Sequence, residues 1–106
     1  MTKPEPLVEG TGLPPLRVRL YIAGTGPNSA SALANLKAAL DPVHDRDKQI
    51  EIIDVLKDPE RALRDGIFVT PMLVKLEPTP ERRILGTLRD RANLLGALGI
   101  EEVPHG

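Results

Sequence analysis

The stretch Ile67-Phe68-Val69-Thr70-Pro71-Met72-Leu73-Val74-Lys75 decides the fold of this chain. It is an apolar run interrupted by one proline, and proline has no backbone N–H to donate to a neighbouring strand. Pro71 therefore opens a strand, and the residues after it are free to pair on both sides. X-Pro is also the peptide bond for which the cis form is least costly, so the bond between Thr70 and Pro71 is a candidate cis bond.

The composition fits one small domain. With 106 residues and 41% hydrophobic content, the chain can bury a modest core, and two domains would not fit. Prolines and glycines are frequent in the first 15 residues, where periodic apolar residues are almost absent. We therefore expect a flexible N-terminal tail at 1–15, one domain at 16–100 and a C-terminal tail at 101–106.

Charge and residue usage exclude several functions. The formal net charge of -1 gives no electrostatic basis for binding nucleic acid or an anionic membrane. Tyr21 and Phe68 are the only aromatic residues, too few to stack bases. The absence of cysteine removes disulfides, thiolate metal sites and thiol redox chemistry. No apolar run approaches membrane-spanning length and the N-terminus does not resemble a signal peptide, so we expect a cytoplasmic protein.

Hydrophobic periodicity predicts four strands and three helices. Apolar and polar side chains alternate over residues 16–22, which is typical of a strand, and a helical repeat follows as far as Leu40. Asp58 and Asp90 are expected to cap the two later helices. The expected strands are 16–22, 49–56, the one opened by Pro71, and 82–88; the expected helices are 30–40, 59–64 and 91–98.

The order of these elements indicates a thioredoxin-like βαβαββα fold. The second strand follows a helix, which implies a parallel, right-handed crossover. The proline-rich connection at 77–81 is too short for a crossover, so the last two strands form an antiparallel hairpin. The result is a mixed four-stranded sheet with helices on both faces, and a cis-Pro71 that opens the third strand fits it.

Two stretches are candidate ligand sites. The glycine-rich turn at 24–29 lacks the Lys-Ser/Thr of a Walker loop and the full dinucleotide fingerprint, so we interpret it as a plain turn in which Ser29 or Asn28 caps the helix. His44 and its neighbouring aspartates lie on one polar loop, which we interpret as a solvated connection rather than a metal site. The sequence therefore predicts no cofactor and no metal.

Several separated segments of the chain share a pattern with one protein family. They are Leu20-Tyr21-Ile22-Ala23-Gly24, Pro27-Asn28-Ser29, Ala32-Leu33, Ile53-Asp54-Val55-Leu56-Lys57-Asp58-Pro59, Thr70-Pro71, Arg82-Arg83-Ile84-Leu85-Gly86 and Leu88-Arg89-Asp90-Arg91. Together they resemble the KaiB family, small clock proteins that work with the KaiC ATPase. The resemblance runs from about Leu16 to Leu98, and separated blocks in the correct order are more specific than any single motif.

The resemblance implies a protein with two folds. KaiB-like proteins interconvert between a tetrameric ground-state fold, βαββααβ, and a rare monomeric thioredoxin-like fold, and the two differ in the second half of the chain. The thioredoxin-like form binds the ATPase ring of KaiC and then further clock components, such as KaiA-like or histidine-kinase proteins. Family prolines that change isomer during switching fall at Pro71, Pro78 and Pro80, which with Thr70 are the fold-switch candidates.

One departure from the family pattern concerns the balance between the two folds. Where the family typically has Gly-Leu-Asp, this chain has Ala97-Leu98-Gly99. Alanine favours a helix by about 1 kcal/mol over glycine, and Gly99 makes a good helix stop. We therefore expect the thioredoxin-like fold to be the main state, and we count Ala97 and Gly99 among the fold-switch candidates.

The candidate partner contacts are charged residues of the sheet and the last helix. Glu51 replaces a basic family residue on an edge strand that the family uses to extend a partner's sheet, although a charge there also prevents aggregation. Arg82 and Arg83 point to opposite faces of one strand, and with Arg89 and Arg91 they could meet acidic residues of a partner. A solvated edge is an equally good interpretation of these arginines.

We expect a non-enzymatic KaiB-like regulator that binds a KaiC-type hexameric ATPase and modulates its phosphorylation and ATPase cycle, in a circadian rhythm or a related timing or stress response. The alternative is an enzyme-related, glutathione-binding protein with a thioredoxin-like fold. Where an oxidoreductase has its nucleophilic cysteine, however, this chain offers only Ser29, which has no apparent base partner. We also expect no second helical domain of the kind that glutathione transferases have.

Overall fold

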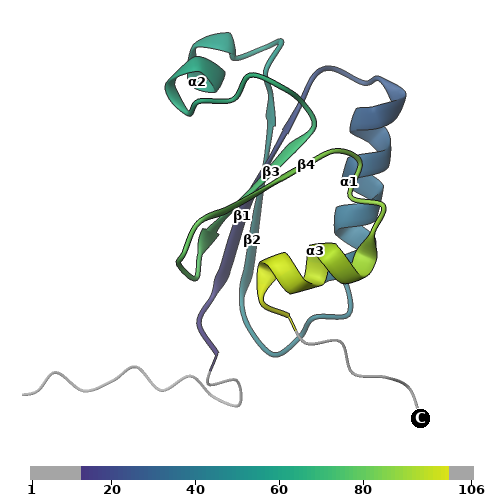
Figure 1. The fold of residues 1–106 in the computed structure, drawn as a ribbon, viewed down its shortest axis with the longest axis vertical. Helices are drawn as coiled ribbons and strands as arrows, with labels where there is room; N and C mark the ends of the chain where they lie inside the picture. Colours follow the sequence, from purple (N-terminus) through teal and green to yellow (C-terminus); the bar gives the residue numbers. More distant parts are fainter. Residues whose placement is uncertain (1–12, 101–106) are drawn as a thin grey trace, which may run out of the picture.

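The computed structural model describes residues 13–100 and shows a four-stranded sheet with helices on both faces (Figure 1). The strand order is β2-β1-β3-β4, in which β1 pairs parallel with β2 and antiparallel with β3, and β3 pairs antiparallel with β4. The predicted thioredoxin-like fold is confirmed, and the arrangement is not the alternative βαββααβ. The elements are β1 (Leu16–Ile22), α1 (Pro27–Leu40), β2 (Lys48–Asp54), α2 (Pro59–Arg64), β3 (Met72–Glu77), β4 (Arg82–Leu85) and α3 (Arg91–Leu98).

The two faces of the sheet carry cores of unequal size. On one face, α1 and α3 cover Leu16, Val18 and Leu20 of β1, all of which are buried. These residues share a face because side chains alternate along a strand. On the other face lies a smaller cluster that includes α2, consisting of Tyr21, Ile53, Ala62, Ile67 and Val74. The predicted tail at 101–106, and residues 1–12 of the predicted N-terminal tail, lie outside the described residues.

The predicted caps are correct for two of the three helices. The Asp58 carboxylate accepts a hydrogen bond from the Arg61 amide at 3.2 Å, and the Asp90 carboxylate accepts one from the Asn93 amide at 3.0 Å. The prediction that Ser29 or Asn28 caps α1 is wrong. The N-cap of α1 is Gly26, with no side-chain cap, and Pro27 begins the helix, where its missing N–H is one that no intrahelical acceptor would satisfy.

Two strands are shorter than predicted because local groups turn the chain. Strand β2 ends at Asp54 rather than at residue 56, since the Asp54 carboxylate accepts a hydrogen bond from the Leu56 amide at 3.0 Å and closes a turn. Strand β4 ends at Leu85 rather than at residue 88. There the chain leaves the sheet through Gly86 (φ 112°) and Leu88 (φ 63°), two backbone conformations that no strand contains.

Within the described part of the chain, three prolines follow cis peptide bonds, at Thr70-Pro71, Glu77-Pro78 and Thr79-Pro80. The cis bond expected before Pro71 is therefore present, and β3 lies between it and the other two. None of the helices within residues 13–100 combines the length and the apolar character needed to cross a membrane.

Candidate functional site

The turn between β1 and α1, where thioredoxin-like enzymes have their nucleophile, is closed by its own polar groups. Ser29 is buried, and its Oγ accepts a hydrogen bond from the Ala23 amide at 3.2 Å, so the hydroxyl points back into the turn. Asp54 accepts hydrogen bonds from the amides of Gly24 and Leu56, which lower the pKa of its carboxyl. In the part of the chain that the structure describes, no three His, Cys, Asp or Glu side chains are placed to hold a metal ion.

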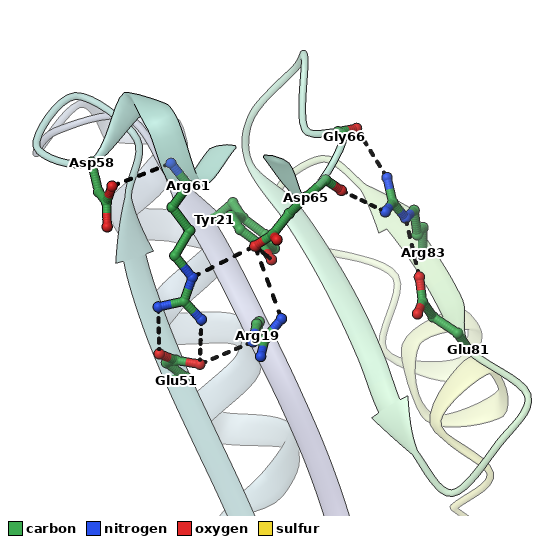
Figure 2. Close-up of polar contacts among 9 residues, drawn as sticks. All are labelled: Arg19, Tyr21, Glu51, Asp58, Arg61, Asp65, Gly66, Glu81 and Arg83. Carbon is green, nitrogen blue, oxygen red and sulfur yellow. Dashed lines mark hydrogen bonds and ion pairs between the residues drawn. The ribbon is translucent and has the colours of Figure 1, made fainter. Parts of the chain in front are cut away.

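A network of charged and polar side chains joins α2 to the sheet (Figure 2). We call it the α2 network. It crosses from the edge strand β2, over the central strand β1 and under α2, to the opposite edge strand β4. Its members are Arg19 and Tyr21 of β1, Glu51 of β2, Arg61 of α2, Asp65 at the end of α2, and Arg83 of β4.

Asp65 is the centre of the α2 network. Its Oδ2 accepts a hydrogen bond from the Tyr21 hydroxyl at 2.7 Å, a short distance that is typical of a charge-assisted bond. The guanidinium groups of Arg61 and Arg19 lie 3.6 and 3.9 Å from the same oxygen. Tyr21 is only 1% exposed, so its ring packs in the core, and its hydroxyl has a partner that the sequence did not indicate.

Glu51 binds two arginines of its own chain. Arg61 forms a two-point contact, with Nη1 at 3.0 Å from Oε2 and Nη2 at 3.1 Å from Oε1. Arg19 Nε donates a further hydrogen bond to Oε1 at 3.0 Å. These two guanidinium groups of the same chain together contact both carboxylate oxygens of Glu51. The structure therefore gives Glu51, which is on an edge strand as predicted, an intramolecular role.

Arg83 connects β4 to the segment that follows α2. Its Nη2 donates to the carbonyl oxygen of Asp65 at 2.8 Å, and its Nη1 donates to that of Gly66 at 3.1 Å. Gly66 has φ 73°, so this residue ends α2 in a left-handed conformation that suits glycine. Arg83 thus fixes the direction in which the chain leaves α2 (Figure 2).

The α2 network shifts the pKa values of its acidic groups. Hydrogen bonds from Arg61, and then from Arg19, hold the pKa of Glu51 below its usual value. The hydrogen bond from Tyr21 and the nearby arginines do the same to the pKa of Asp65. Burial, together with the Asp65 carboxylate, raises the pKa of Tyr21. The network therefore holds two carboxylates in their charged form.

A groove of about 280 Å³ on the α2 side of the sheet includes Arg17, Arg19 and Glu51 in its lining. Its two arginines are paired within the chain. Arg17 lies 3.3 Å from Glu77, and Arg19 lies 3.0 Å from Glu51. This groove consequently has no open cationic group with which to bind an anion.

Four of the eight exposed large apolar side chains of the described residues lie in one excursion of the chain, between the end of β2 and the start of β3. We call them the apolar end; they are Leu56, Leu63, Phe68 and Val69. Phe68 is the most exposed of them, at 80%. The α2 network holds this excursion on the sheet, and Figure 1 shows it projecting beyond the strands at the α2 end of the molecule. A group of exposed apolar side chains is typical of a protein-binding surface.

The predicted contact arginines do not share one surface in the structure. Arg82 and Arg83 point to opposite faces, as predicted, because they lie opposite Lys75 and Val74 of β3. They therefore cannot meet one flat partner surface together. Arg82 is exposed, as are Arg89 before α3 and Arg91 at its first position. The fold-switch candidates lie in two places: Thr70, Pro71, Pro78 and Pro80 flank β3, whereas Ala97 and Gly99 end α3.

Sequence reasoning missed Arg61 and Asp65, and it missed the apolar end as a group. Arg61 lies in the six-residue α2 and Asp65 is its C-cap, four positions later, a spacing that suggests only a weak surface pair. Their partners Tyr21 and Glu51 come from distant strands, so only the folded topology brings the four together.

The comparison with known proteins covers most of the described residues. A model of the KaiB domain matches residues 19–100. The circadian clock oscillator protein KaiB of Nostoc punctiforme is 42% identical over 91 residues, which cover 84% of this chain and 88% of that protein. This chain belongs to the KaiB family. KaiB membership confirms the resemblance noted in the sequence, and the curated relatives carry the name of clock oscillator proteins rather than of enzymes.

Solved structures place this KaiB-family chain among thioredoxin-like folds. The N-terminal domain of Synechococcus elongatus SasA superposes with a TM-score of 0.71 at 25% identity, covering 99% of this chain and 98% of that domain. Fasciola hepatica thioredoxin gives a TM-score of 0.65 at 17% identity, over 86% of this chain and 83% of thioredoxin, a likeness of fold alone.

Proposed function

We propose that this chain is a non-enzymatic, cytoplasmic regulator of a circadian or related timing system, and that it binds a KaiC-type hexameric ATPase and modulates its phosphorylation and ATPase cycle. The observation that carries the proposal is membership of the KaiB family over residues 19–100, combined with an arrangement that matches the SasA domain. The lack of cysteine and the inward-facing Ser29 hydroxyl favour this regulator over a redox or glutathione enzyme.

We assign the contact with the ATPase ring to the apolar end, with Phe68 at its centre. Aromatic side chains provide much of the binding energy of protein interfaces, and Phe68 is the only exposed one among the described residues. Arg82, Arg89 and Arg91 remain the charged contacts we propose, because all three are exposed and lie outside the α2 network. Glu51 and Arg83 instead serve by holding the excursion that presents Phe68.

We further propose that the chain has the thioredoxin-like arrangement as its main state in solution. Ala97 continues α3, and Gly99 ends the helix with φ 75°, the conformation that an αL cap requires. Thr70, Pro71, Pro78 and Pro80 remain the candidates for any exchange with a second fold. A tetramer in which residues 90–98 form a strand, observed by NMR or crystallography, would contradict this part of the proposal.

The test of ring binding uses a purified KaiC hexamer with ATP and measures its affinity for this chain by biolayer interferometry. Phe68→Ala should weaken binding at least tenfold, which corresponds to about 1.4 kcal/mol. Leu85→Ala is the matched control: Leu85 is 59% exposed but lies on β4, outside the apolar end, and its loss should leave the affinity unchanged. Equal effects of both variants would refute the assignment of the surface. The absence of any binding by the unaltered chain would refute the proposed function.

A further inference from the structure

Lys75 of β3 is a buried cation in the larger of the two cores. Only 5% of the residue is exposed. Its side chain lies on the face covered by α1 and α3, because Lys75 is opposite Val18 of β1 and two residues after Leu73, and both of these belong to that core. A lysine is seldom buried to this extent unless an anion accompanies it.

The structure gives the Lys75 ammonium no such anion. Within residues 13–100, Lys75 forms no hydrogen bond and no ion pair through its side chain. Lys48, by contrast, is less buried and donates a hydrogen bond to the Leu40 carbonyl at 2.7 Å. Across the sheet, Lys75 faces the apolar Val18 on one side and the positively charged Arg82 on the other.

The helices that cover this face bring no carboxylate to Lys75. The buried residues of α3 are Leu94, Leu95 and Leu98, and those of α1 are Ser29, Ala32, Leu36, Ala39 and Leu40. Arg82 is therefore the one charged group that faces Lys75 from the described elements packed around it. Loss of water, and then the charge of Arg82, lower the pKa of Lys75.

We propose that Lys75 is a built-in destabilising element of this arrangement, so that neutralising its charge shifts the chain toward the fold described above. The reason is that burial removes water from the ammonium and provides a like charge instead of an anion. The penalty is absent in any state that hydrates Lys75, which includes the unfolded chain. This penalty opposes the helix-favouring effect of Ala97.

This inference deepens the proposed preference for one fold, but its test does not need the ATPase. Lys75→Met removes the charge at nearly constant volume. We expect its folding equilibrium constant to rise severalfold over that of the unaltered chain, measured as a higher urea midpoint by circular dichroism at pH 7. Lys37→Met is the control: Lys37 is exposed on α1, and its replacement should leave the midpoint close to that of the unaltered chain. A Lys75→Met midpoint at or below that of the unaltered chain would overturn the inference.

The pH dependence separates a charge effect from a gain in packing. Because the pKa of Lys75 is lower in the folded chain than in the unfolded one, the unfolded chain binds more protons as the pH approaches the ordinary lysine value of 10.5. The free energy of unfolding of the unaltered chain should therefore rise relative to that of Lys75→Met in that range. The difference in stability between the two proteins should narrow. Other groups titrate alike in both proteins and cancel in the difference. If the difference in stability stays constant from pH 7 to 10.5, the gain of Lys75→Met comes from packing alone, and the inference would fail.

A second variant tests the missing anion directly. Arg82→Glu places a carboxylate opposite Lys75 in the hairpin, at a distance at which cross-strand pairs interact. We expect it to stabilise the unaltered chain severalfold more than it stabilises the Lys75→Met variant, a coupling that a double-mutant cycle measures. Equal effects of Arg82→Glu in the two backgrounds would show that Lys75 does not lack a partner.

Discussion

The hydroxyl of Tyr21 lies 2.7 Å from the carboxylate of Asp65, and this hydrogen bond joins the central strand of the sheet to the residue that ends α2. The two residues are 44 positions apart in the sequence. The phenol ring is buried and its hydroxyl points at the excursion between β2 and β3. The hydrogen bond to Asp65 therefore holds α2 against the sheet.

Loss of that hydroxyl should weaken the attachment of α2. Tyr21→Phe keeps the ring in the core and removes the donor, which leaves the Asp65 carboxylate with its more distant arginines only. We expect a loss of about 1.5–3 kcal/mol in the free energy of unfolding, the usual range for a hydrogen bond to a charged group. Urea denaturation measures it. An unchanged midpoint would show that water replaces the hydroxyl at no cost.

Acid should destabilise the fold through the same network. The pKa values of Glu51 and Asp65 lie below their usual values of 4.5 and 3.8 in the folded chain, so the unfolded chain binds more protons in that range. The stability that they contribute is complete above those usual values and is lost as the pH falls through the folded ones.

Denaturation at pH 7 and pH 3 measures this contribution. Glu51→Gln should be less stable than the unaltered chain at pH 7 and should lose less on acidification. Glu60→Gln, an exposed residue of α2 outside the network, serves as the control and should show the full acid loss. If Glu51→Gln and Glu60→Gln respond to acid alike, the network is not the source of the dependence.

Two glycines at the end of α3 should respond to alanine with opposite signs. Gly96 lies within the helix with open space around its Cβ position, so Gly96→Ala should stabilise the fold by about 1 kcal/mol. Gly99 has equally open space but φ 75°, and Gly99→Ala should destabilise by about 1 kcal/mol because a Cβ is strained there. Thermal unfolding distinguishes the pair. Changes of the same sign would mean that residues 91–99 do not end as a helix with an αL cap in solution.

Arg83 should protect the segment around Phe68 from proteolysis. Arg83→Ala removes both hydrogen bonds to the carbonyls after α2, and we expect faster chymotryptic cleavage after Phe68. Arg82→Ala alters the neighbouring residue, which points to the other face of β4, and should leave the cleavage rate unchanged. Equal rates for all three proteins would show that Arg83 does not restrain this segment.

The fold was predictable from the sequence because its signals are local. Alternation in residues 16–22, the Asp58 and Asp90 caps and the proline before β3 each act over a few residues, and together they leave one topology. The α1 cap was mispredicted because Pro27 moved the helix start upstream of both candidate caps, and the Ser29 hydroxyl then turned to the Ala23 amide.

The candidate site was harder to predict because its groups come from distant elements. Glu51 was identified as unusual on the edge strand, but its role depends on Arg19 of β1 and Arg61 of α2, whose approach follows from the crossover. The burial of Lys75 could likewise not be predicted from the sequence, since a lysine late in an apolar strand can equally well reach solvent. Exposure of Phe68 is decided by where α2 lies, and no local pattern carries that information.

Because the two cores differ in size, we expect the two sides of the sheet to unfold at different free energies. The layer of α1 and α3 shares one continuous apolar cluster with the central strands, whereas α2 rests on a few apolar residues and on the α2 network. Segments with few buried contacts detach at lower free energy than the whole molecule unfolds. The backbone amides of α2 should therefore exchange with solvent deuterium through openings that leave α1 folded, and Phe68 belongs to this least firmly held unit of the protein.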